Sequence, residues 1–100
     1  QQVRVYGISE RHQAYAKQIG RLLRERGIRA VVDEGRGSLN ARLRVGRAFR
    51  APYSVVVGDG EVSAGSVAVS RRGEKEGKQR ELQEFIDEML AEVANFRISG

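Results

Sequence analysis

A short run, Tyr53–Val57 (YSVVV), places the strongest constraint on what this chain can fold into. The run is apolar apart from one serine and lacks the alternation of a half-exposed strand, so it is typical of a central strand covered on both faces. Pro52 precedes the run and ends a helix, because the residue before a proline disfavours helical geometry. A strand of this kind predicts a layered α/β domain.

The segments before this strand predict a strand–helix–strand unit followed by a second helix. Residues 3–8 (VRVYGI) have the β-branched, apolar character of a strand, and Ser9 is a suitable N-cap for a helix that ends near residue 26. Residues 28–33 (IRAVVD) predict the second strand, and Ser38 is a suitable cap for the second helix.

The second helix is expected to have two different sides. Leu39 and Gly46 fall on the side that faces the sheet, and glycine there permits a close approach at some cost in helix propensity. The opposite side is polar and basic, with an i, i+4, i+7 spacing. It comprises Asn40, Arg44 and Arg47.

The segments after the central strand complete the sheet. Residues 58–65 predict a turn, and Val67 and Val69 alternate with small or polar neighbours, as in a half-exposed antiparallel strand. Residues 70–77 predict a charged loop and residues 79–95 an amphipathic helix. The order of elements predicts a three-layer α/β sandwich: a mixed, mostly parallel sheet of four to five strands with three helices.

In such sheets the binding crevice lies beyond the carboxyl ends of the parallel strands. These ends fall at residues 8–10, 33–37 and 58–61, and they converge on residues 40–61, which contain the arginine helix and the turn that ends in Glu61. We therefore expect the functional site at this edge.

The charge distribution favours a polyanion as the partner of this edge. The chain has 18 Lys and Arg against 13 Asp and Glu, a net charge of +5. Residues 34–50 hold five arginines and one acid, whereas residues 80–95 hold five acids and one arginine. Such polarity predicts a basic face suited to nucleic acid. An arginine-rich composition of the source organism is the alternative explanation.

Other kinds of site lack the necessary residues. The absence of cysteine excludes disulfides, thiolate catalysis and cysteine zinc sites, and it suits a cytoplasmic protein. His12 is the only histidine, and its place in the first turn of a helix predicts a surface residue without a catalytic role. Gly35 and Gly58 each begin only half of a dinucleotide fingerprint. No run approaches the roughly 20 apolar residues that span a bilayer.

Several residues of this region have the chemistry for RNA recognition. Arginines contact phosphates or stack on bases, asparagine hydrogen-bonds a base edge, and a carboxylate accepts hydrogen bonds from base amino groups. The alternative is that the arginines form a solvated helix face and that Glu61 only begins a strand. The candidates are Arg36, Asn40, Arg44, Arg47, Arg50 and Glu61.

The order of motifs resembles the C-terminal anticodon-binding domain of class II aminoacyl-tRNA synthetases, in the group specific for histidine, glycine, proline and threonine. The likeness runs from residue 3 to about residue 93. Within the group the chain is most similar to the threonyl-tRNA synthetases (threonine–tRNA ligases). The motifs that carry the likeness are Gly27-Ile28-Arg29, Pro52-Tyr53, Gly58-Asp59-x-Glu61, and Val67-Ala68-Val69 followed by arginines.

The resemblance implies that residues 1–100 form a single anticodon-binding domain, and the start at Gln1 without methionine suggests a fragment of a larger synthetase. The partner it implies is the anticodon stem-loop of a tRNA in the cytoplasm, with no membrane. This fragment would hold no cofactor, because ATP and magnesium belong to the parent's catalytic domain, through which the parent dimerises. The implied base-contacting positions are Arg36, Arg44, Arg50, Glu61 and the Ser70–Arg71 junction, all bordering one crevice.

Two positions depart from the family pattern. Gly60 replaces the usual lysine of the turn, and Ser70 replaces the usual arginine after the Val-x-Val strand. Either Arg71 takes that role through a one-residue change of register or the contact is lost. These departures favour a second hypothesis, a synthetase-like paralogue or accessory domain that binds protein or non-specific nucleic acid.

Overall fold

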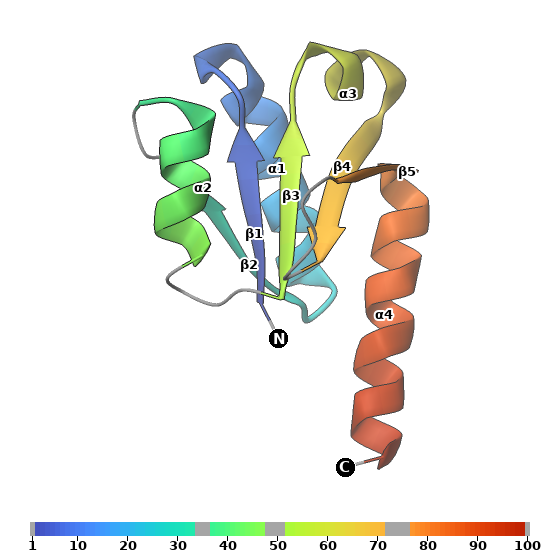
Figure 1. Cartoon of the computed structure of the whole chain (residues 1–100). Helices are drawn as coiled ribbons and strands as arrows, with labels where there is room; N and C mark the ends of the chain where they lie inside the picture. Colours follow the sequence, from blue (N-terminus) through green and yellow to red (C-terminus); the bar gives the residue numbers. More distant parts are fainter. Residues whose placement is uncertain (1, 34–36, 48–51, 72–76, 100) are drawn as a thin grey trace.

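The computed structural model describes residues 2–33, 37–47, 52–71 and 77–99, and in them five strands form one mixed sheet in the order β2-β1-β3-β4-β5 (Figure 1). Three parallel strands occupy one side of the sheet, and two antiparallel strands extend it. The strands are β1 (Gln2–Gly7), β2 (Arg29–Asp33), β3 (Tyr53–Val57), β4 (Ser66–Arg71) and β5 (Lys78–Glu81). The predicted α/β class, the mixed sheet and the central place of β3 are confirmed.

The long helices lie on both sides of this sheet. In Figure 1, α1 lies behind β1 and β2, α2 lies in front of them, and α4 runs beside β4 and β5 and extends past the sheet. A 3-10 turn, η1, leads into α1. The bounds are η1 (Glu10–His12), α1 (Gln13–Glu25), α2 (Leu39–Arg47), α3 (Asp59–Ala64) and α4 (Leu82–Ser99).

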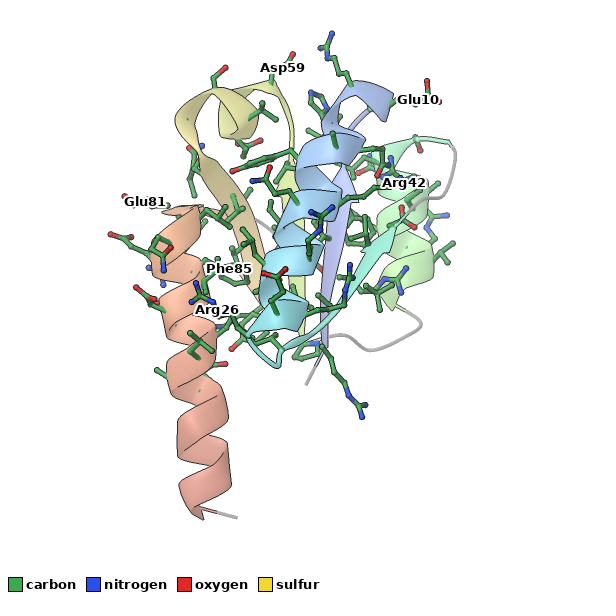
Figure 2. The ribbon with its side chains drawn as sticks, turned by 180° about the vertical axis from the view of Figure 1, so that it is seen from behind. Glu10, Arg26, Arg42, Asp59, Glu81 and Phe85 are labelled. Carbon is green, nitrogen blue, oxygen red and sulfur yellow. The ribbon has the colours of Figure 1, made fainter. Side chains whose placement is uncertain are left out.

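The apolar core lies on the face of the sheet that α1 and α4 cover. Alternate strand residues point to this face and are buried, and Phe85 projects from α4 toward it (Figure 2). Removing this apolar surface from water supplies the main drive for folding. The principal core residues are Val3, Val5, Ile19, Leu23, Val55, Val57, Val67, Phe85, Ile86 and Met89.

The opposite face, beneath α2, is polar and closely packed. Arg4 and Tyr6 point to this face, and the Arg4 Nε donates to the Tyr6 hydroxyl at 3.3 Å. A Cβ at Gly46 would overlap the Tyr6 hydroxyl oxygen and lie 3.2 Å from Arg4 Nε. The predicted role of Gly46, to let the helix approach the sheet, is therefore confirmed.

A buried arginine fixes α2 against the ends of two strands. Arg42 is 7% exposed, and its Nε donates to Asp33 Oδ2 at 2.6 Å. Its terminal nitrogens donate to the carbonyl oxygens of Gly7, at 2.6 Å, and Ile8, at 3.4 Å. Arg42 therefore joins the helix to the carboxyl ends of β1 and β2, at the edge where the site was expected.

Two predicted elements were wrong in detail. Residues 58–65 contain the helix α3 instead of a turn, and residues 79–81 belong to β5, so the last helix begins at Leu82. A six-residue helix is too short to show a periodic pattern, and β5 forms because Arg80 pairs with Val67 of β4. Both elements depend on neighbours that are distant in the sequence.

The contact at Gly46 predicts that Gly46→Ala lowers the free energy of unfolding by about 1–3 kcal/mol, because the new methyl group overlaps the Tyr6 hydroxyl. Chemical denaturation measures this loss. Gly60→Ala is the matched control, since no atom lies within 4 Å of a Cβ there. Adding Tyr6→Phe to Gly46→Ala should restore part of the stability, and an unaltered Gly46→Ala variant would contradict the close approach.

The burial of Arg42 predicts that Arg42→Met costs about 3–5 kcal/mol of unfolding free energy, because Asp33 loses its nearest cation and two carbonyl groups lose a donor. Arg44→Met on the exposed side of the same helix should stay within about 0.5 kcal/mol. Equal effects of the two substitutions in thermal and chemical unfolding would show that Arg42 is not an anchor.

Candidate nucleic-acid interface

The exposed side of α2 carries two of the predicted polar and basic residues. Asn40 and Arg44 are exposed, four residues apart, and Arg42 points inward between them. Arg47 is the last residue of α2, and its side chain lies outside the described part of the chain. Arg36 and Arg50 also lie outside the described residues.

Sequence reasoning missed the inward role of Arg42. The signal was present, because Leu39, Arg42, Leu43 and Gly46 share the i, i+3, i+4, i+7 spacing of one helix side. Asp33, the carboxylate that Arg42 contacts, also lies 3.8 Å from an Arg4 nitrogen. The acid at this edge of the sheet is therefore compensated by buried cations.

Glu61 lies in the first turn of α3 and not at the start of a strand, so only that part of the alternative is wrong. Its Oε1 accepts a hydrogen bond from the Gly58 backbone N–H at 2.8 Å, and its Oε2 accepts one from Gln79 Nε2 at 3.2 Å. The side chain is half-buried. Each carboxylate oxygen has two lone pairs, so Glu61 keeps acceptor capacity for a further donor while its position is fixed by two protein groups.

His12 is buried, with 4% of its surface exposed, and the prediction of a surface residue was wrong. Its Nδ1 accepts a hydrogen bond from the Ser9 backbone N–H at 3.1 Å. In the neutral ring the proton therefore lies on Nε2, which donates to Asp59 Oδ1 at 2.7 Å. Asp59 is the first residue of α3, so this side chain links the start of α1 to the start of α3.

The carboxylate of Asp59 also forms an ion pair with Arg11, whose terminal nitrogen lies 2.6 Å from Oδ2. The hydrogen bond from His12, together with the charge of Arg11, lowers the pKa of Asp59, and some loss of hydration opposes the shift. Figure 2 shows Asp59 at the same edge of the molecule as Glu10 of η1. The turns after β1 and β3 are thus tied together by one ionised carboxylate.

Ser70 and Arg71 lie nearer the first end of β3, whereas Glu61 follows its last end. In the antiparallel β3–β4 pair, Arg71 is opposite Tyr53, the first residue of β3. Glu61 comes after Val57, the last residue of β3. Four residue steps along a strand correspond to about 13 Å. β4 thus carries the chain back toward the other end of the sheet, and a single crevice shared by these residues stays a prediction.

Ser70 and Arg71 also point to opposite faces. Ser70 is opposite Ser54, and Ser54 is opposite Arg4. Directly opposite residues point to the same face, so Ser70 points to the face that α2 partly covers. Arg71 lies in the row of Tyr53 and Val3, on the α4 face. The register is regular, so Arg71 does not take the place of an arginine at position 70.

On the α4 face, Arg71 borders a groove of about 460 Å³ between β4, β5 and α4. An Arg71 terminal nitrogen lies 3.7 Å from Glu92 Oε1, and the Tyr53 hydroxyl donates to the same carboxylate at 2.6 Å. Burial of Tyr53 and its bond to Glu92 raise the pKa of Tyr53 to about 12. These contacts join α4 to the sheet.

The described residues contain no group of three or more His, Cys, Asp or Glu side chains that could hold a metal ion. None of the helices described is long and apolar enough to cross a membrane.

Comparison with known proteins gives relatives over nearly the whole chain. The threonine–tRNA ligase of Carboxydothermus hydrogenoformans is 38% identical over 96 residues, which cover 96% of this chain and 15% of that protein. The threonine–tRNA ligase of Lactococcus lactis is 41% identical over 88 residues, which cover 88% of this chain and 14% of the relative. The chain therefore spans about one seventh of the length of these relatives.

Solved structures agree. The RNA binding domain of threonyl-tRNA synthetase from Cryptosporidium parvum superposes with a TM-score of 0.83 at 26% identity, over 88% of this chain and 22% of that one. Histidyl-tRNA synthetase from Nostoc shares the fold, with a TM-score of 0.81 at 14% identity over 91% of this chain and 22% of that one. The family model described as anticodon binding domain matches residues 2–92. With most of its length matched in this way, the chain belongs to the anticodon binding domain family.

Proposed function

We propose that this chain is the tRNA anticodon recognition domain of a threonine–tRNA ligase and selects the cognate tRNA for a catalytic domain elsewhere in the parent protein. One observation carries the proposal furthest. Two helices begin at the carboxyl edge of the sheet and carry groups suited to RNA. The helix α2 exposes Asn40 and Arg44, and α3 carries a half-buried carboxylate acceptor, Glu61. The threonine–tRNA ligase relatives support the choice of tRNA.

The two parts of this surface do different work. Arg44 contacts backbone phosphates, and such contacts do not depend on which base is present. Asn40, one turn earlier on α2, hydrogen-bonds a base or ribose edge. Glu61 accepts hydrogen bonds from the Watson–Crick edge of an unstacked base. Ser70 lies on the sheet face that α2 partly covers, opposite Ser54 of β3. Arg36 and Arg50 join this surface from the family resemblance alone, and Arg47 joins it from the helical spacing of the sequence.

The proposal places the remaining chemistry in the parent protein. ATP and magnesium act in the catalytic domain of the parent, as the resemblance to threonine–tRNA ligases implies. The parent forms a dimer through that domain and works in the cytoplasm. This chain contributes tRNA selection and no turnover.

The second candidate function is an accessory domain that binds protein or nucleic acid without reading the anticodon. Ser70 favours it, because it offers a short hydroxyl where the family usually has an arginine, and Arg71 points to the other face. Titration of the chain with threonine-type and unrelated anticodon stem-loops separates the two functions. Equal affinity for all loops would support the accessory role.

The phosphate contact predicts that Arg44→Ala weakens binding to every anticodon stem-loop by a similar factor and lowers the slope of log affinity against log salt by about one. Filter binding over a range of salt concentrations measures both quantities. Arg21→Ala on α1 is the matched control, because Arg21 is an exposed arginine on the other side of the sheet. If both variants have the same effect, the charge acts through net attraction and α2 is not the contact surface.

The acceptor role of Glu61 predicts that Glu61→Gln reduces discrimination among base-substituted anticodon loops by about 1–3 kcal/mol. The amide oxygen of glutamine still accepts from the Gly58 N–H, so the helix cap is retained. The measurement is the ratio of affinities for the cognate loop and for loops with each anticodon base changed. Glu84→Gln on α4 removes the same charge from an exposed position and should leave the ratio unchanged.

A further inference from the structure

The short helix α3 depends on contacts from outside itself. It has six residues, and none of them is buried. A helix this short is unstable in isolation because the cost of nucleation is not recovered by one or two hydrogen-bonded turns. The Glu61 carboxylate is held by the Gly58 N–H and Gln79 Nε2, but the place of the helix that carries it is set by whatever holds the two ends of α3.

The first end of α3 is held by His12. Both ring nitrogens are engaged: Nδ1 accepts from the Ser9 N–H at 3.1 Å, and Nε2 donates to Asp59 Oδ1 at 2.7 Å. The side chain of His12 is 5% exposed, so solvent cannot readily replace either bond. Because the acceptor is ionised, the bond to Asp59 is of the stronger, charge-assisted kind.

The second end of α3 is held by Tyr15, three residues after His12. The Tyr15 hydroxyl donates to the carbonyl oxygen of Ser66 at 3.0 Å, and Ser66 follows α3 by two residues. Burial and the nearby charge of Glu61 raise the pKa of Tyr15, in keeping with a carboxylate close to that ring. His12 and Tyr15, at the start of α1, thus contact the first residue of the helix that carries Glu61 and the first residue of the strand that follows it.

We propose that His12, acting through Asp59, is a positioning residue for Glu61 and thereby for discrimination among anticodon bases. His12 does not contact RNA, because its ring is enclosed by the protein. It fixes the first residue of α3, two residues before Glu61, so that the carboxylate presents its free lone pairs in one direction. The inference rests on the proposed role of Glu61.

The experiment compares two substitutions that break different bonds to the same carboxylate. His12→Leu removes the buried donor, and Arg11→Gln removes the cation on the outside, where the Arg11 side chain is 71% exposed. His12→Leu should reduce discrimination among base-substituted threonine anticodon stem-loops by about fivefold or more. It should leave the salt dependence of binding unchanged. Arg11→Gln should change discrimination by less than about twofold, since exposed ion pairs contribute little.

A conservative variant separates positioning from packing. His12→Gln keeps an amide N–H within reach of Asp59 and should retain most of the discrimination that His12→Leu loses. If His12→Leu fails to fold, Asp59→Ala takes its place, because the Asp59 side chain is 68% exposed and its removal leaves no buried gap. Asp59→Ala should relax discrimination to a similar extent.

The outcomes distinguish this inference from the proposed function. If Glu61→Gln relaxes discrimination while His12→Leu and Asp59→Ala only lower the melting temperature, His12 is structural and the positioning role is overturned alone. If Glu61→Gln leaves discrimination unchanged, Glu61 contacts no base and both proposals are overturned. If the double variant His12→Leu/Glu61→Gln discriminates no worse than Glu61→Gln alone, the two residues act in one path, as proposed.

Discussion

The buried guanidinium of Arg42 is the contact on which the geometry of this edge depends. Removing two charges from water is costly, and such a pair is favourable only when other hydrogen bonds satisfy the remaining groups. Here the carbonyl oxygens of Gly7 and Ile8 accept from the same guanidinium that binds Asp33. One side chain therefore fixes α2 to β1 and β2 together. Because Arg42 points inward, Asn40 and Arg44 point to solvent.

The turn after β3 is held by a different device. The helix α3 has no apolar side to bury, so its place is set by the polar contact between His12 and Asp59 and by the hydroxyl of Tyr15. In both cases a carboxylate at the carboxyl edge of the sheet, Asp33 or Asp59, is paired within the protein. The groups left for a ligand belong to residues near these contacts: Arg44 is two residues from Arg42, and Glu61 is two residues from Asp59. This separates the residues that hold the site from those proposed to contact RNA.

The two departures from the family pattern have different structural weight. Gly60 has open space around it, so a side chain there would change the surface charge and not the fold. Ser70 lies in a regular strand whose register the β3–β4 pairing fixes, so its neighbour Arg71 cannot replace a missing arginine. Neither departure alters the fold, and both leave the chain within the anticodon binding domain family.

The sequence alone determined the strands β1 to β4, the three long helices, the close approach at Gly46 and the exposed side of α2 at Asn40 and Arg44, because each leaves a local pattern of spacing or a characteristic residue. Only the tertiary structure decided that His12 is buried, that Arg42 binds Asp33 and the ends of two strands, that Glu61 lies in a helix and that Arg71 faces α4. Those properties depend on pairs such as His12 with Asp59, or Arg71 with Glu92, that are far apart in the chain. No local periodicity encodes such contacts, because strand pairing and the packing of helices on the sheet bring the partners together.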